Sequence, residues 1–335
     1  MSSLGRRALS ITRTALLFVL ALALAPVLLP AALGFDLARL ALRGTPMTSS
    51  RLYLFGLYYF AAELVGLTVL GLSWLRRLGR REALLEPTYA IQAAWAGALL
   101  WAIRVLFDVR FELVGGELCA PGPVLLFVRH ASIVDTLLPT ALIGWPQRMR
   151  LRFVLKRELL ALPCLDVAGN RLPNAFVGRD GADSAREIAK VRALGEGLGA
   201  RDGVVIYPEG TRATDAKRAR ALAKLELADP PRFERVRALR SLLPVRPGGP
   251  LALLEAAPEA DVVFVAHTGF EGFAELADIW RGGMVGRRVR IELSRHERAE
   301  IPTEAGARLA WLDARWSELD ARISAGSEPP ETAPA

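Results

Sequence analysis

The segment RHASIVD places a histidine and an aspartate, His130 and Asp135, at a spacing that could do acid–base chemistry. It follows the apolar run 124–128, and the end of a strand is where α/β proteins place reactive groups. We expect the carboxylate to fold back toward the imidazole, fixing its tautomer and leaving the other ring nitrogen to accept a proton. No nucleophile accompanies the pair, so the substrate, for instance an alcohol, would supply it. The simpler alternative is a capping aspartate beside a solvent-facing histidine, because one short motif is weak on its own.

A second motif, YPEGTR at residues 207–212, follows another short β-branched run. Its proline and Gly210 favour a tight turn that lets a ligand approach the backbone closely. Arg212 offers a planar fork to a phosphate group, and Thr211 offers a hydroxyl. Glu209 either holds Arg212 or bonds a substrate hydroxyl.

Basic residues gather between these motifs in the stretch 148–157, and Arg179 closes the run after it. The stretch is either a solvated basic face or a surface held against anionic lipid headgroups. His267 lies in an apolar run without a companion at catalytic spacing, so we expect a structural role. Three scattered histidines and two distant cysteines offer no metal site, and none is expected.

The elements that must position these motifs begin with long apolar segments. Residues 14–35 carry no charge, and 22 residues at 1.5 Å each match a hydrocarbon core of about 30 Å. A cleaved signal peptide is the alternative, but its apolar core is usually shorter. Residues 52–75 carry one charge, Glu63, which would be either a functional group near mid-membrane or a protonated carboxyl facing another helix. Residues 89–103 favour an interfacial helix over a third span.

Flanking charges and overall composition point the same way. The arginines that precede the first apolar segment and follow the second predict a hairpin with both ends in the cytoplasm. The 335 residues are 52% hydrophobic and carry a net charge of +8. This composition excludes a disordered chain, and two cysteines exclude a disulfide scaffold. No nucleic-acid-binding motif accompanies the basic charge, so we expect a membrane face as partner and no nucleic acid.

From about residue 109 the pattern is that of an α/β domain. Short apolar runs predict strands near residues 111–115, 123–128, 203–207 and 261–266, and helical composition lies between them at 183–197 and 213–227. We therefore expect an α/β fold, a mixed sheet flanked by helices, preceded by a transmembrane helical hairpin. The expected organisation is membrane-anchoring helices over 1–108, the α/β domain over 109–325 with a docked amphipathic helix near its end, and a disordered tail over 326–335.

Taken together, the motifs resemble those of the glycerolipid acyltransferase family, typified by 1-acyl-glycerol-3-phosphate acyltransferase. RHASIVD resembles the family's first block, with Arg129 where asparagine is commoner, and PEGTR resembles the third. Residues 156–179 resemble the second block, but Asp166 and Pro173 stand where the family has glycines. The segment LLPVRP at 242–247 resembles the fourth loosely.

The resemblance covers about residues 109–290, and it implies a role for each matched residue. His130 would deprotonate the acceptor hydroxyl while Asp135 orients its ring. The glycerol phosphate of the acceptor would be bound by Arg179, Glu209, Gly210, Thr211 and Arg212.

The implied activity is transfer of a fatty acyl chain to the free hydroxyl of lysophosphatidic acid in phospholipid synthesis. Acyl-CoA or acyl carrier protein would be the donor, with no cofactor or metal. The alternatives are another lysophospholipid acceptor, as in phospholipid remodelling, or an inactive lipid-binding scaffold. We expect an integral membrane protein, in the bacterial inner membrane, whose catalytic domain faces the cytoplasm among membrane phospholipids.

Overall fold

The computed structural model describes residues 3–178, 185–271 and 276–327. Three long helices open the chain: α1 (Ser3–Arg43), α2 (Ser49–Arg76) and α3 (Arg81–Phe107). The strands are β1 (Arg110–Val114), β2 (Val124–Val128), β3 (Arg150–Lys156), β4 (Ala175–Val177), β5 (Asp202–Ile206), β6 (Asp261–Thr268) and β7 (Arg288–His296). The remaining α-helices are α4 (Pro163–Arg171), α5 (Ala185–Leu194), α6 (Asp215–Ala228), α7 (Pro230–Val236), α8 (Gly248–Ala256), α9 (Leu276–Trp280) and α10 (Ala305–Ser327).

The described strands form one mixed sheet, which confirms the predicted fold class. Their order in the sheet, which the sequence did not predict, is β1-β7-β6-β2-β5-β3-β4. Neighbouring strands run parallel except β6 and β7, which pair antiparallel. The central strand β2 reads VLLFV and is buried along its whole length. Successive side chains of a strand point to opposite faces, so β2 contributes apolar residues to both faces of the sheet.

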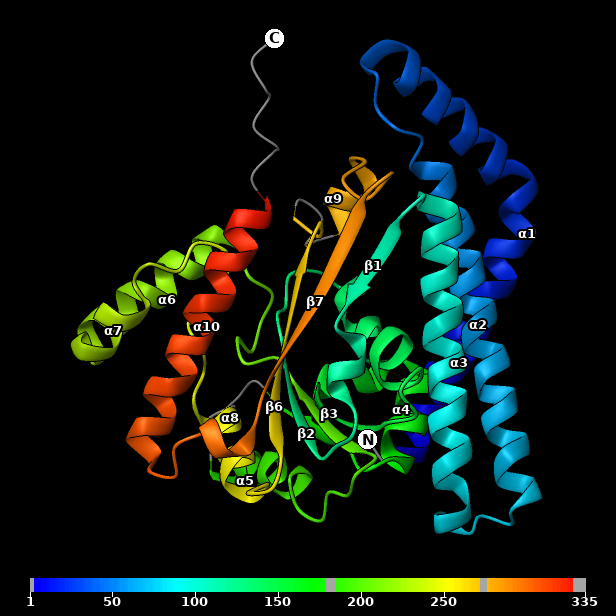
Figure 1. The fold of residues 1–335 in the computed structure, drawn as a ribbon. Coiled ribbons are helices and arrows are strands. Elements are labelled where there is room, and N and C mark those ends of the chain that lie inside the picture. Colours follow the sequence, from blue (N-terminus) through cyan, green and yellow to red (C-terminus); the bar gives the residue numbers. More distant parts are fainter. Residues whose placement is uncertain (1–2, 179–184, 272–275, 328–335) are drawn as a thin grey trace.

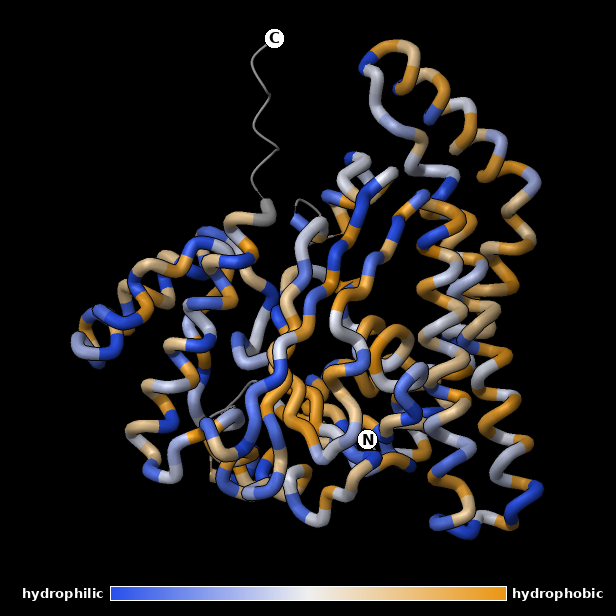
Figure 2. Tube along the Cα trace, in the orientation of Figure 1, coloured by the Kyte–Doolittle hydropathy of each residue, from blue (hydrophilic) through white to orange (hydrophobic). Residues whose placement is uncertain are grey.

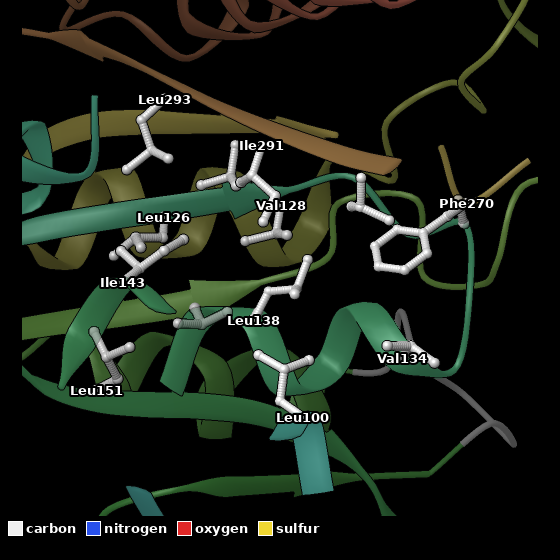
Figure 3. Packing of buried hydrophobic residues seen from close by; sticks show 14 of the residues in the cluster. Leu100, Leu126, Val128, Val134, Leu138, Ile143, Leu151, Phe270, Ile291 and Leu293 are labelled. Carbon is white, nitrogen blue, oxygen red and sulfur yellow. The ribbon is translucent and has the colours of Figure 1, made fainter. Parts of the chain in front are cut away.

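Helices cover both faces (Figure 1). One face packs against α3 and two short helical segments, η2 (Val134–Leu137) and η3 (Pro139–Gly144). Figure 3 shows Leu100 of α3 among Val134 and Leu138 of this core. The other face packs against α5, α8 and α10, and the C-terminal helix buries a predicted apolar stripe that includes Trp316 and Ile323. This helix ends at Ser327, and the rest of the predicted tail lies outside the described residues.

The three N-terminal helices are each long and apolar enough to cross a membrane. Figure 2 shows the apolar character along α1, whose most hydrophobic stretch is not buried by the rest of the protein. The segment 89–103, expected to lie at an interface, is the centre of the longer helix α3. That helix packs between α2 and the α/β domain, and 39% of its most apolar stretch is buried.

Both ends of α1 contact the α/β domain. Near its start, Arg6 donates from Nε and Nη2 to the Asp166 carboxylate of α4, at 3.1 and 3.0 Å. Near its end, Phe35 stacks on Trp280 of α9 with ring centroids 6.3 Å apart, and Arg39 lies over the same indole. Helix α1 therefore contacts the α/β domain near both ends and packs against α2 between them.

Glu63 of α2 is not exposed to lipid and faces a neighbouring helix, α4, as one of its two interpretations expected. It is fully buried, and its Oε2 accepts the backbone N–H of Cys164 in the first turn of α4, at 3.0 Å. The Cys164 thiol donates in return to the Glu63 carbonyl at 3.1 Å. Together with the Asp166 ion pairs, this contact fixes the helical layer to α4.

Candidate active site

The parallel strands β2, β5 and β6 end side by side, and the predicted motifs meet at that edge. His130 follows β2, and its Nδ1 lies 3.0 Å from Asp135 Oδ1. Asp135 Oδ2 accepts the backbone N–H groups of Ala131 and Ser132, both at 2.7 Å, which folds the carboxylate back onto the ring. The aspartate thus caps the turn and binds the imidazole at once. Because His130 is only 7% exposed, it is not a solvent-facing histidine.

Glu209 does not bind Arg212 in this structure. Its carboxylate is buried, and Oε2 accepts the His130 backbone N–H at 2.6 Å while Oε1 accepts the Leu243 N–H at 2.9 Å. Burial raises the pKa of Glu209 to about 8, and the two backbone donors oppose that rise. Glu209 therefore ties the loop after β5 to the histidine after β2.

The Leu243 segment is held in turn by the C-terminal helix. Trp316 Nε1 donates to the Leu243 carbonyl at 2.9 Å, and Asp320 accepts the Leu242 N–H at 2.7 Å. Beyond Leu243, the Arg246 N–H donates to the Pro208 carbonyl at 2.9 Å. The segment 242–247, resembling a fourth motif only loosely, thus lies directly against the PEGTR loop.

The PEGTR loop places a glycine and cationic side chains beside the Glu209 contacts. Gly210 has a φ of +68°, a left-handed conformation that disfavours any side chain. Lys217 Nζ donates to the Arg212 carbonyl at 3.1 Å and lies 3.4 Å from Thr211 Oγ1. The Ala213 N–H donates to the His130 carbonyl at 2.8 Å, so the loop is anchored on the histidine.

The basic stretch before α4 is largely engaged within the domain. Arg150 and Arg152 both lie against Asp202, with shortest distances of 2.8 and 3.7 Å, and Arg157 lies 3.3 Å from Glu187. The predicted phosphate ligand Arg179 falls outside the described residues. Within the described residues, no group of His, Cys, Asp and Glu side chains could hold a metal ion.

Comparison with known proteins identifies this site's family. Residues 110–265, from β1 into β6, match the family model described as Acyltransferase. The α/β domain belongs to the acyltransferase family. The chain also resembles the crystal structure of PlsC, a 1-acyl-sn-glycerophosphate (LPA) acyltransferase from Thermotoga maritima. The match has a TM-score of 0.50 and 15% identity over 83% of this chain and 97% of that one, which establishes a shared fold. No curated protein matches the chain.

Next to the His130–Asp135 pair, the acyltransferase domain holds a second group of polar residues, which the sequence did not predict. His267 at the end of β6 places its Nε2 3.1 Å from the Arg129 carbonyl and 3.6 Å from Asp135 Oδ2. Arg129 is also buried, and its Nη1 donates to the His267 carbonyl and to Glu271 Oε1, the latter at 2.7 Å. Burial, reinforced by the Arg129 charge, lowers the pKa of His267 to about 4 despite the opposing charge of Asp135.

This depressed pKa makes the acyltransferase domain less stable in mild acid. Below pH 6.5 the unfolded chain takes a proton on His267, whereas the folded chain takes it only near pH 4, so stability falls as the pH drops through this window. The contribution is up to about 3 kcal/mol. We expect His267→Gln, which cannot titrate, to show a smaller drop in apparent melting temperature between pH 6.5 and 4. An equal drop in both proteins would contradict this.

Sequence reasoning also missed two residues at the site, Tyr207 beside the catalytic pair and Arg246 beside the PEGTR loop. Tyr207 packs its ring against His130, with centroids 4.7 Å apart, and its hydroxyl donates to the Asp135 carbonyl at 3.3 Å. Arg246 lies so close to Gly210 that a Cβ there would come within 2.8 Å of its Cδ. Tyr207 could have been found, because it directly precedes PEGTR. Arg246 could not, because only the fold brings its segment to the loop.

Proposed function

We propose that this acyltransferase transfers a fatty acyl chain from acyl-CoA or acyl carrier protein to the free hydroxyl of lysophosphatidic acid. The observation that carries the proposal is the buried contact of His130 Nδ1 with Asp135, which leaves Nε2 as the nitrogen that can act as a base. The resemblance of the RHASIVD and PEGTR segments to known acyltransferase motifs supports the same chemistry.

In the proposed reaction, His130 Nε2 takes the proton of the acceptor hydroxyl as its oxygen attacks the thioester carbonyl. The new C–O bond forms, the C–S bond breaks, and the departing thiolate recovers the proton from the imidazolium. Asp135 keeps the imidazole in the required tautomer and stabilises its charged form. A base of this kind contributes about 10²–10⁴-fold to the rate.

We place the acceptor phosphate at the PEGTR loop. Gly210 lets the phosphate approach the backbone, and Thr211, Arg212 and Arg179 would supply a hydroxyl and two guanidinium groups. Arg246, exposed beside Gly210, adds a cation that the sequence did not point to. Glu209 would act on the acceptor through the His130 backbone that it holds.

The test is acyl transfer by the full-length protein in phospholipid–detergent micelles. Labelled acyl-CoA and then acyl carrier protein are offered against lysophosphatidic acid and a panel of other lysophospholipids. We expect a labelled product that is lost in the His130→Ala variant, with lysophosphatidic acid the preferred acceptor. A different preferred lysolipid would replace the acceptor but keep the chemistry. No turnover of any pair by the folded protein would favour a lipid-binding scaffold.

We further propose that the N-terminal helices hold the domain at the cytoplasmic face of the inner membrane and enter the bilayer from that face. Because the two ends of α1 contact the same α/β domain through Arg6 and Trp280, a perpendicular span would draw polar parts of that domain into the hydrocarbon. Exposed apolar side chains along α1 supply the surface that faces lipid.

Labelling with a membrane-impermeant maleimide tests this placement. We expect Arg43→Cys, at the end of α1, and Leu227→Cys, on exposed α6, to react from the same side of sealed membrane vesicles. The native Cys119 and Cys164 are buried, so the parent protein is the blank. Reaction of the two variants from opposite sides would show instead that α1 crosses the bilayer.

A further inference from the structure

We propose that His267 is a positioning residue of the transfer reaction, which clamps the peptide bond leading into His130. The inference rests on the proposed function, because it concerns the same base. The peptide bond between Arg129 and His130 has two polar groups, the Arg129 carbonyl and the His130 N–H. Each is bound by a buried side chain, one from the loop after β5 and the other from β6.

The first half of the clamp comes from the β5 side. Glu209 Oε2 accepts the His130 N–H at 2.6 Å. The second half comes from β6, where His267 Nε2 lies 3.1 Å from the Arg129 carbonyl. In the sheet, β2 lies between β5 and β6, so its N–H and carbonyl groups point to these two neighbours. At the end of β2, side chains thus continue the pairing that backbone groups provide within the strand.

The geometry fixes the state of the His267 ring. A carbonyl only accepts, so Nε2 must carry the hydrogen that it donates to Arg129. That N–H also lies 3.6 Å from Asp135 Oδ2, the oxygen that the Ala131 and Ser132 amides already hold. The His267 ring therefore turns the positive end of its Nε2–H bond toward the carboxylate that orients His130.

Arg129 closes the arrangement from the other direction. Its side chain donates to the His267 carbonyl and pairs with Glu271, whose Oε2 accepts the Gly269 N–H at 2.5 Å. Arg129 and His267 thus exchange hydrogen bonds, each from side chain to the other's backbone. The charged and titratable groups facing His267 are Asp135, Arg129 and Glu271, with His130 beyond Asp135.

The test compares three substitutions at this position. In His267→Gln, the amide nitrogen can stand where Nε2 stood. His267→Asn is too short to reach the Arg129 carbonyl, and His267→Met fills the volume without a donor. We expect kcat within about threefold of wild type for the Gln variant and about 10–100-fold lower for the other two. KM for both substrates should stay within about twofold, because His267 touches neither.

The pH profile separates positioning from a structural role. Loss of the N–H near Asp135 should move the acidic limb of kcat to higher pH by about half a unit in the Asn and Met variants. A structural role would lower the apparent melting temperature and leave the profile in place. The proposal is overturned if the folded Asn or Met variant matches wild type in kcat and profile. It is equally overturned if neither folds. An inactive wild type would instead refute the proposed function.

Discussion

Replacing His130 with alanine is expected to lower kcat for acyl transfer by about 10²–10⁴-fold, the contribution of a well-placed general base. The His130 backbone bonds to Glu209 and Ala213 do not involve the imidazole, so the fold should survive. The effect should therefore appear in kcat, with little change in KM. The measurement is single-substrate kinetics with labelled donor in micelles of fixed lipid composition.

His296→Ala is the matched control, because it deletes an imidazole at the far side of the domain. His296 pairs with Glu300 and packs against Trp311, well removed from the motifs at the ends of β2 and β5. We expect this variant to retain wild-type turnover. Retention of most activity by His130→Ala would rule out His130 as the base.

The second large effect is expected for Glu209→Gln. A glutamine would turn an amide N–H₂ toward one of the two backbone N–H groups that Glu209 accepts, and one buried donor would lose its partner. We expect destabilisation of about 1–3 kcal/mol from that orphaned donor. We also expect kcat to fall about 10²-fold, because displacing a catalytic group by about 1 Å costs that much.

The two roles considered for Glu209 predict different kinetics. If Glu209 holds the His130 backbone, kcat and the apparent melting temperature fall together while KM changes little. If it bonds the acceptor hydroxyl, KM for the lysolipid rises and the melting temperature stays close to wild type. Glu234→Gln makes the same substitution at an exposed position on α7 and serves as the control for the chemical change itself.

Strands buried on both faces were predictable from the sequence, whereas two alternating strands were not recognised. β2, β5 and β6 read as continuous apolar runs and lie where they were expected. The pattern of β7 alternates arginine with valine and isoleucine, a period of two that is typical of a strand. The same alternation in β3 was interpreted only as basic charge, and its arginines turn out to pair with Asp202.

In the site, contacts between residues close in sequence were predictable, whereas contacts between distant residues were not. The meeting of His130 and Asp135 was predictable because they are only five positions apart, with a turn between them. The bonds from Glu209 to His130 and Leu243 join residues 79 and 34 positions apart, and spacing cannot reveal them. His267 lacked a partner in sequence because its partner, the Arg129 carbonyl, is a backbone atom 138 positions away.

The structure explains one departure from the family pattern, the aspartate at position 166. In the resembled motif a glycine is usual there, and its replacement left the acceptor pocket in question. The structure gives the carboxylate another task, because it is fully buried and receives Arg6 and Arg7 from the first turns of α1. The change at Asp166 therefore concerns how the N-terminal helix is held.

The attachment of α1 at both ends affects how turnover should depend on the surrounding membrane. With α1 fastened near both ends, the helical layer cannot tilt independently to accommodate a thicker or thinner membrane. A protein inserted from one face is also not subject to mismatch with the full hydrocarbon thickness, which tunes proteins that cross both leaflets. If the helices enter the bilayer from one face, as proposed, turnover should be indifferent to the chain length of the surrounding phospholipids. It should respond instead to the packing and charge of the one monolayer that the helices would contact.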